Sequence, residues 1–271
     1  MKRLFSALPF CAAIAPVQAD EIRTQDLLHL PDAQVYVLGE FHDSAIHHEN
    51  QAKAVEALSP TAMVFEMLTS KQVEAVGPEE RQDQAFFEAA TDWSQSGWPD
   101  LSLYWPIFAA APDAVLYGGG VPREALREAF SEGAADVFGD DAARFGLDQP
   151  LPADQKSARE SEQFDAHCGA MPLEMMGGMV AAQRVRDAAL AKAALDALDQ
   201  HGAPVVVITG NGHARTDWGA PAMMRLANAD LSVFSLGQLE AAPEDAPPYD
   251  AWLVTDRTER GDPCAAFATT E

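Results

Sequence analysis

The stretch Val35-Tyr-Val-Leu-Gly-Glu-Phe-His42 joins an apolar strand pattern to a polar ending. Its first four residues are β-branched, aromatic or aliphatic, which favours a buried strand. The glycine that follows lets the backbone turn tightly before Glu40 and His42. These two residues are two positions apart in an extended chain, so their side chains point to the same side. The stretch therefore predicts a buried strand whose carboxyl end carries polar chemistry.

Similar short apolar runs recur along the chain, each bounded by Gly, Pro, Asp or Asn. Between them lie stretches with helical spacing at His47–Leu58, Glu79–Thr91, Pro122–Glu132 and Met171–Gln200. Strands that alternate with helices predict an α/β fold, with a mostly parallel sheet covered by helices on both faces. The segment Asp92–Ala111 carries Trp and Tyr among Pro and Gly, and predicts a helical, aromatic-rich insertion or lid. The predicted strands are Val35–Leu38, Ala62–Glu66, Ala114–Gly118, Val205–Thr209, Leu231–Leu236 and Ala251–Thr255.

The chain of 271 residues carries 42 acidic and 18 basic side chains, a net charge of −24. Nucleic-acid binding depends on Lys and Arg that neutralise phosphates, so this balance argues against a DNA or RNA partner. It argues equally against docking onto anionic lipid. With 48% hydrophobic residues the composition is globular. We expect one large domain over residues 20–271.

The N-terminus has the pattern of a cleavable export signal. Two basic residues precede a short apolar run, and Val17-Gln18-Ala19 places small residues where signal peptidase cuts. The run is too short and interrupted for a spanning helix, which needs about 20 apolar residues. A bulky ring precedes Cys11, where a lipoprotein signal needs a small residue. We therefore expect a signal peptide over residues 1–19, a periplasmic mature protein that begins at Asp20, and no lipid anchor.

Removal of that signal leaves two cysteines, Cys168 and Cys264, in an oxidising compartment. An even pair there predicts one disulfide bond. Two free structural thiols are the alternative, while a metal site built on them would lack the usual CxxC spacing.

Polar side chains end three of the predicted strands. Glu40 and His42 follow the first strand, Glu66 ends the second, and Gly210-Asn-Gly-His213 follows the strand at Val205–Thr209. Ligands of open α/β sheets bind outside the carboxyl ends of the strands, so these residues share one crevice if the strands are neighbours. Two carboxylates and two imidazoles there could act as an acid/base set or hold a divalent metal. For each residue alone, a structural hydrogen bond is the alternative.

Two more imidazoles open the helix predicted after this strand. His47 and His48 stand beside Glu49 at its start. One interpretation is a solvated first turn. The other is that His47 reaches back toward Glu40 and His42 across the same crevice.

Several blocks of the sequence together resemble the ChaN-like haem-binding family, which is similar in turn to the Tiki, TraB and erythromycin-esterase proteins. The resemblance implies an exported α/β protein that binds haem and serves iron uptake beside an outer-membrane uptake system. It also implies that two subunits pair around stacked haems. The blocks are the opening stretch to His42, His47-His48 with Gln51, Val64-Phe-Glu66, Ala182-Gln-Arg-Val-Arg-Asp187, Ile208-Thr-Gly-Asn-Gly-His213 and Asp262-Pro-Cys264.

The resemblance carries two hypotheses about the site. In the wider superfamily the matching Glu and His positions are associated with hydrolysis or metal dependence. A metal-dependent hydrolase that uses Glu40, His42, Glu66 and His213 is therefore the alternative function. In the haem-binding branch the resemblance implies a Tyr ligand, for which Tyr104 in the aromatic insertion is our candidate.

Haem binding requires an axial donor, an apolar slot and partners for the propionates. Met175 and Met179 lie near a Gly-Gly pair and could supply an adaptable apolar surface, although Met clusters are most often core filler. Arg186 and Arg215 are candidate propionate partners, with a salt bridge to a nearby acid as the alternative. We expect haem over an aromatic and Met-rich rim above the Glu/His cluster, with its iron held by an exposed donor such as Tyr104.

Overall fold

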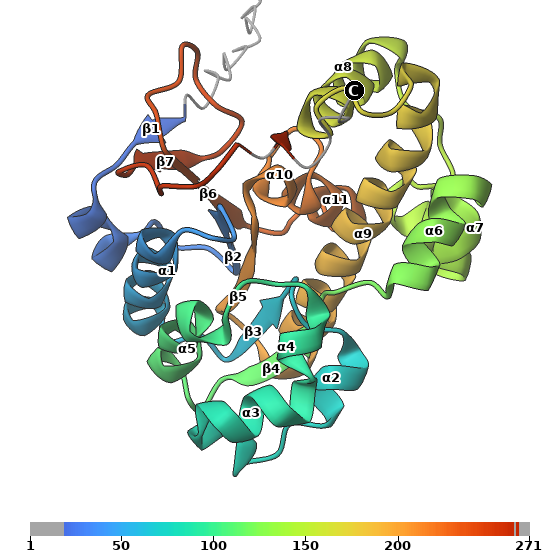
Figure 1. The fold of residues 1–271 in the computed structure, drawn as a ribbon. Coiled ribbons are helices and arrows are strands. Elements are labelled where there is room, and N and C mark those ends of the chain that lie inside the picture. Colours follow the sequence, from blue (N-terminus) through green and yellow to red (C-terminus); the bar gives the residue numbers. More distant parts are fainter. Residues whose placement is uncertain (1–18, 263, 266–271) are drawn as a thin grey trace, which may run out of the picture.

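The computed structural model describes residues 19–262 and 264–265. Within these residues, seven strands form one parallel sheet in the order β1-β7-β6-β2-β5-β3-β4 (Figure 1). The predicted α/β fold with a parallel sheet is confirmed. The predicted signal peptide lies outside the described residues except for its last position. No helix of the described part is long and apolar enough to cross a membrane.

Six of the seven strands were predicted, with ends that differ by at most three residues. The unpredicted strand, β1, consists of two acidic residues that pair with β7 and carry no apolar pattern. The strands are β1 (Asp20–Glu21), β2 (Val35–Glu40), β3 (Ala62–Phe65), β4 (Val115–Gly118), β5 (Val205–Gly210), β6 (Val233–Leu239) and β7 (Ala251–Val254).

Helices or 3₁₀ turns connect the strands from β1 to β6, and several of them differ from prediction. Helix α9 (Met176–His201) begins at Met176 rather than Met171, because Pro172 and a short 3₁₀ turn precede it. Helix α8 (Ala153–Ala166) was not predicted, because its polar sequence has no apolar stripe. The other α-helices are α1 (Ala45–Leu58), α2 (Ser70–Glu74), α3 (Gln84–Thr91), α4 (Trp93–Ser96), α5 (Leu101–Ala110), α6 (Arg123–Glu132), α7 (Ala134–Phe138), α10 (Asn211–Ala214) and α11 (Ala220–Ala227). The 3₁₀ helices are η1 (Thr24–His29), η2 (Glu80–Gln82), η3 (Gly139–Phe145) and η4 (Leu173–Met175).

Alternate side chains of the central strands pack on opposite faces of the sheet, as a period of two requires. On β2, Val35 and Val37 join a core with α6, α9 and α11. Tyr36 and Leu38 join a second core with α1, α3 and α5. Figure 1 shows α9 with α6 and α7 on one side of the sheet and α1 with α5 on the other. The prediction of helices on both faces is confirmed.

The aromatic insertion is helical, as predicted, and forms α4 and α5. Trp93 and Tyr104 are 1% and 0% exposed, and both belong to the core that includes α1. Burying two large rings stabilises this packing by several kcal/mol, at about 25 cal/mol per Å² of apolar surface. The insertion is therefore a fixed part of the core.

The strand register brings three polar strand ends together. Glu40 pairs with Gly210 across β2 and β5, and Phe65 pairs with Ile208 across β3 and β5. The next residue, Glu66, donates its backbone N–H to the Ile208 carbonyl at 3.1 Å. Because β3, β5 and β2 are neighbours, the predicted convergence at one edge of the sheet is confirmed.

A disulfide bond joins Cys168, just after α8, to Cys264 near the C-terminus. The two cysteines are 96 positions apart in the sequence. The predicted pairing is confirmed, and it ties the C-terminal segment to the helical side of the molecule.

Candidate functional site

Glu40 is a buried carboxylate at the centre of the site. It ends β2 and is 1% exposed. Its Oε1 accepts hydrogen bonds from the Tyr104 hydroxyl at 3.0 Å and from His42 Nδ1 at 2.8 Å, while its Oε2 lies 3.4 Å from His48 Nε2. Burial opposes ionisation, but His42 and His48 together lower the pKa of Glu40 to about 2. Glu40 is therefore an ionised carboxylate that orients the imidazole rings around it.

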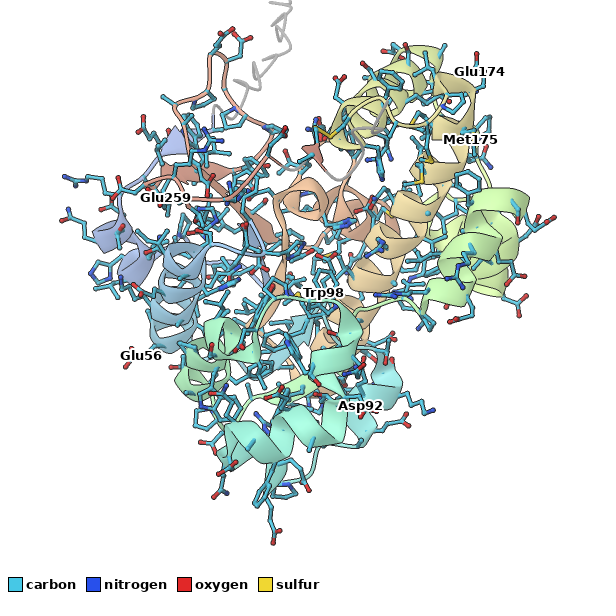
Figure 2. The ribbon with its side chains drawn as sticks, in the orientation of Figure 1. Glu56, Asp92, Trp98, Glu174, Met175 and Glu259 are labelled. Carbon is cyan, nitrogen blue, oxygen red and sulfur yellow. A yellow bond between two sulfur atoms is a disulfide. The ribbon has the colours of Figure 1, made fainter. Side chains whose placement is uncertain are left out.

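His42 is the partly exposed imidazole of the site. Its side chain is 33% exposed, and its Nε2 lies 3.9 Å from Glu66 Oε2. Burial disfavours its charged form, but Glu40 and Glu66 raise the pKa of His42 to about 9. The ring centre lies 4.8 Å from that of Trp98, which Figure 2 shows near the middle of the molecule. A Cβ atom on Gly210 would stand 2.8 Å from His42 Nε2, so a larger residue there would displace the ring from this position.

Glu66 lies opposite, at the end of β3. Its Oε2 accepts hydrogen bonds from the Thr209 hydroxyl at 2.7 Å and from the Gly210 N–H at 2.8 Å. Its Oε1 lies 3.5 Å from His213 Nε2 and 3.6 Å from an Arg186 Nη. Burial would raise the pKa of Glu66, yet the nearby cations and hydrogen bonds lower it. The second carboxylate is thus also ionised.

Asp187 on α9 completes the cluster. Its Oδ1 lies 2.6 Å from His213 Nδ1, and burial raises the pKa of Asp187. Burial acts against the charged form of His213, but Glu66 and Asp187 raise the pKa of that ring. Two carboxylate-bound imidazoles, His42 and His213, therefore lie on either side of Glu66. Asp187 ends one of the sequence blocks that carry the family resemblance, but nothing local indicated its contact with His213.

His47 and His48 are fully buried, so a solvated first turn of α1 is wrong. His47 Nδ1 accepts a hydrogen bond from the Phe41 N–H, and its Nε2 lies 2.9 Å from the Thr255 hydroxyl. Burial lowers the pKa of His47 to about 4. The ring that approaches Glu40 is His48, not His47 as expected.

Two clefts open beside this cluster. The first has a volume of about 290 Å³ and is lined by His42, His213 and residues of α8 and α9. We call it the His42 cleft; Phe41 and Trp218 supply its aromatic walls. The second, of about 310 Å³, is lined by residues that include Glu66, Trp98 and Arg186. The cluster therefore separates two openings rather than closing around one cavity.

Comparison with known protein families shows which family this chain belongs to. A sequence model of the family described as haem-binding uptake, Tiki superfamily, ChaN matches residues 27–224. The chain belongs to this ChaN family.

Two solved structures align with this ChaN-family chain. One describes cofacial heme binding to ChaN of Campylobacter jejuni; it aligns with a TM-score of 0.65 and 17% identity over 84% of this chain and 88% of that one. The other is the type III effector HopBA1, with a TM-score of 0.41 and 16% identity over 83% of this chain and 88% of that one. At these identities the first likeness concerns the fold. No curated protein matches the sequence.

Tyr104 of this ChaN-family protein is not an exposed iron donor, contrary to expectation. Its side chain is 0% exposed because α5 packs against α1, and its hydroxyl donates to Glu40. Burial raises the pKa of Tyr104, so its hydroxyl stays protonated. All four tyrosines of the sequence lie in the described part, and none is exposed: Tyr36, Tyr104, Tyr117 and Tyr249.

The two candidate methionines lie away from the His42 cleft. Met175 is 41% exposed and Met179 half-buried, and neither lines that cleft. Figure 2 shows Met175 near α8, well separated from Trp98. The expected Met-rich rim is therefore not beside the Glu/His cluster.

Both candidate arginines are paired with acids of the chain. Arg186 faces Glu66 at 3.6 Å and lines the second cleft. Arg215 makes two hydrogen bonds to Asp217, at 3.0 and 2.8 Å, and its guanidinium stacks 3.7 Å from the Trp218 ring centre. For both residues the salt-bridge alternative describes the structure.

The structure does not support the expected divalent-metal site of Glu40, His42, Glu66 and His213. No group of three or more His, Cys, Asp or Glu side chains is arranged to hold a metal ion among residues 19–262 and 264–265. The physical reason is that the candidate ligands already bind one another or the backbone. Glu40 Oε1 accepts two hydrogen bonds, from Tyr104 and His42, and Glu66 Oε2 accepts two, from Thr209 and Gly210.

Proposed function

We propose that this ChaN-family protein binds haem in the His42 cleft, with His42 Nε2 as the donor to the iron. The family match over residues 27–224 supports haem as the ligand. The observation that carries the assignment of the site is the hydrogen bond between His42 Nδ1 and Glu40 at 2.8 Å. A carboxylate on one ring nitrogen fixes the tautomer and orientation of a metal-binding histidine. Because the pKa of His42 is about 9 in the free protein, iron binding would release the Nε2 proton, while Glu40 keeps Nδ1 protonated and leaves Nε2 as the ligating atom, as in proteins that hold haem iron through a proximal histidine.

The residues around His42 fit a flat apolar ligand. Phe41 is 40% exposed beside it, and Val180 and Trp218 line the same cleft. Small-ligand pockets are mostly apolar and aromatic with a few placed polar groups, which is the composition found here. The iron would supply the Lewis acid that His42 binds, while Glu40 and Tyr104 hold the imidazole in place.

The size of the cleft supports only partial enclosure of haem. Its volume of about 290 Å³ lies just below the range for small-molecule pockets, roughly 300 to 1,000 Å³. Part of the macrocycle would then stay at the surface, where a second subunit can cover it. Heme binds cofacially to ChaN of Campylobacter jejuni, which supports a pair of subunits around two stacked haems.

The proposed setting is haem or iron uptake outside the cytoplasm, beside an outer-membrane uptake system. A disulfide between Cys168 and Cys264 supports an oxidising compartment. The N-terminal pattern of residues 1–19 supports export. Intact mass of the exported protein tests this setting. A mature form that begins at Asp20 is expected, and retention or lipidation of Cys11 would contradict it.

Haem titration of residues 20–271 tests the binding site. We expect the wild type to shift the Soret band and His42→Ala to lose that shift. His29→Ala removes an exposed imidazole on η1 and should behave like the wild type. A wild type that leaves the haem spectrum unchanged would reject haem binding. An unaltered spectrum and affinity in His42→Ala would reject His42 as the donor.

A further inference from the structure

Arg159 is a buried cation that faces the His42 cleft. It comes from the middle of α8, is 8% exposed, and lines the cleft with His42 and Trp218. Among the residues that the structure describes, it is the only Lys or Arg in the buried class. A buried guanidinium is expected to be paired, because a charge loses its hydration when it is removed from water.

Arg159 has no carboxylate within ion-pair distance among the described residues, although the charge of Asp187 across the same cleft acts on it from further away. One Nη donates to Gln155 Oε1 at 3.1 Å, and the guanidinium lies 5.1 Å from the Trp218 ring centre. Its Nε is buried and has no hydrogen-bond partner. Within the described ranges, no ion pair of 4.0 Å or less joins Arg159 to a carboxylate. Among residues 19–262 and 264–265, the most buried guanidinium is therefore not in a direct ion pair.

The neighbouring arginines show that pairing is available at this end of the molecule. Arg215 binds Asp217 and approaches Glu162 at 3.6 Å, and Arg186 faces Glu66. Arg159 also retains its charge near neutral pH, since burial lowers its pKa only to about 10. The guanidinium is therefore a charged donor that lines a ligand site and whose Nε has no hydrogen-bond partner.

We propose that Arg159 binds a carboxylate of the ligand in the His42 cleft, which for haem is a propionate. This inference rests on the proposed haem function. The planar guanidinium matches a carboxylate in size and donor spacing, so it recognises that group specifically. A local cation is also needed because a protein with a net charge of −24 repels an anionic ligand. Arg159 thus replaces Arg186 and Arg215 as the propionate partner.

A comparison of haem with haem dimethyl ester tests the role of Arg159. The ester keeps the iron and the ring but has no carboxylate. We expect the wild type to bind haem about tenfold or more tightly than the ester, as for loss of a charge-assisted hydrogen bond. Arg159→Met should bind both ligands with the affinity that the wild type has for the ester. Arg127→Met removes an exposed arginine of α6 and should keep the wild-type preference.

The outcomes separate this inference from the function on which it rests. A wild type that shifts the Soret band with neither ligand rejects haem binding itself. Equal affinity of the wild type for haem and ester leaves haem binding intact and overturns the role of Arg159. A wild-type preference that persists in Arg159→Met also overturns it. Arg159→Gln, which keeps a polar group at this position, is measured in parallel with the same expectation, so failure of one variant to fold does not decide the result.

Discussion

Tyr104→Phe tests whether the Tyr104 hydroxyl stabilises the buried Glu40 carboxylate or binds the haem iron. The change removes one hydroxyl and keeps the fully buried ring, so it creates no large cavity. The lost contact is a hydrogen bond of 3.0 Å to the ionised Glu40. Hydrogen bonds to charged groups contribute roughly 1.5–3 kcal/mol. Because His42 still donates to the same oxygen at 2.8 Å, we expect a loss near the lower end, about 2 kcal/mol.

Urea unfolding at neutral pH measures this loss as a lower free energy of unfolding with an unchanged denaturant slope. Tyr249→Phe is the matched control, since its hydroxyl donates to the neutral Asn211 carbonyl at 3.2 Å and should contribute about 1 kcal/mol or less. The haem spectrum of Tyr104→Phe should keep the wild-type Soret band. Loss of that band, or a stability equal to that of the wild type, would refute the supporting role of Tyr104.

Three further predictions concern the rest of the molecule. Replacing Cys168 and Cys264 by Ser should lower the free energy of unfolding in urea by about 4–5 kcal/mol, because the chain-entropy model assigns roughly that value to a loop of about 100 residues; no change would contradict it. Arg260 donates to both oxygens of Glu240 and lowers its pKa to about 2 from 4.5. An acid whose pKa is lowered in the folded state stabilises the fold at pH values above 4.5, and this contribution is lost as the pH falls to about 2. The stability difference between wild type and Arg260→Gln, measured by thermal melts, should therefore shrink as the pH falls from 4.5 to about 2. A difference that stays constant over this pH range would count against the ion pair. Glu66→Gln should cost about 3 kcal/mol in urea unfolding, because it breaks a buried ion-pair network, while keeping the Soret band; loss of the band would place Glu66 in the haem site.

The sheet could be predicted from the sequence because its strands are short apolar runs bounded by turn residues. The polar ends of β2, β3 and β5 could also be predicted to meet, since parallel neighbours share one edge. Strand β1 and helix α8 could not, because neither carries an apolar period. Their positions depend on pairing with β7 and packing against α9, contacts that no local pattern encodes.

The partners within the site were harder to predict than its location. His48 reaches Glu40 from the first turn of α1, and Asp187 reaches His213 from α9, 26 positions away in the sequence. Only the packing of α1 and α9 against the strand ends reveals these two contacts. For Tyr104 the sequence predicted an exposed residue, and the structure buries it. Aromatic residues among Pro and Gly indicate an exposed surface as readily as a packed insertion, and the hydrogen bond to Glu40 distinguishes the two.

Chemical rescue of His42→Gly tests the central claim most directly, because it asks whether an imidazole at this position binds the iron. The variant removes the ring and leaves its space beside Trp98 and Gly210. We predict that the variant loses the wild-type Soret band and that added free imidazole restores it, while His29→Gly needs no rescue. A His42→Gly variant that keeps the wild-type haem spectrum without imidazole would contradict the account.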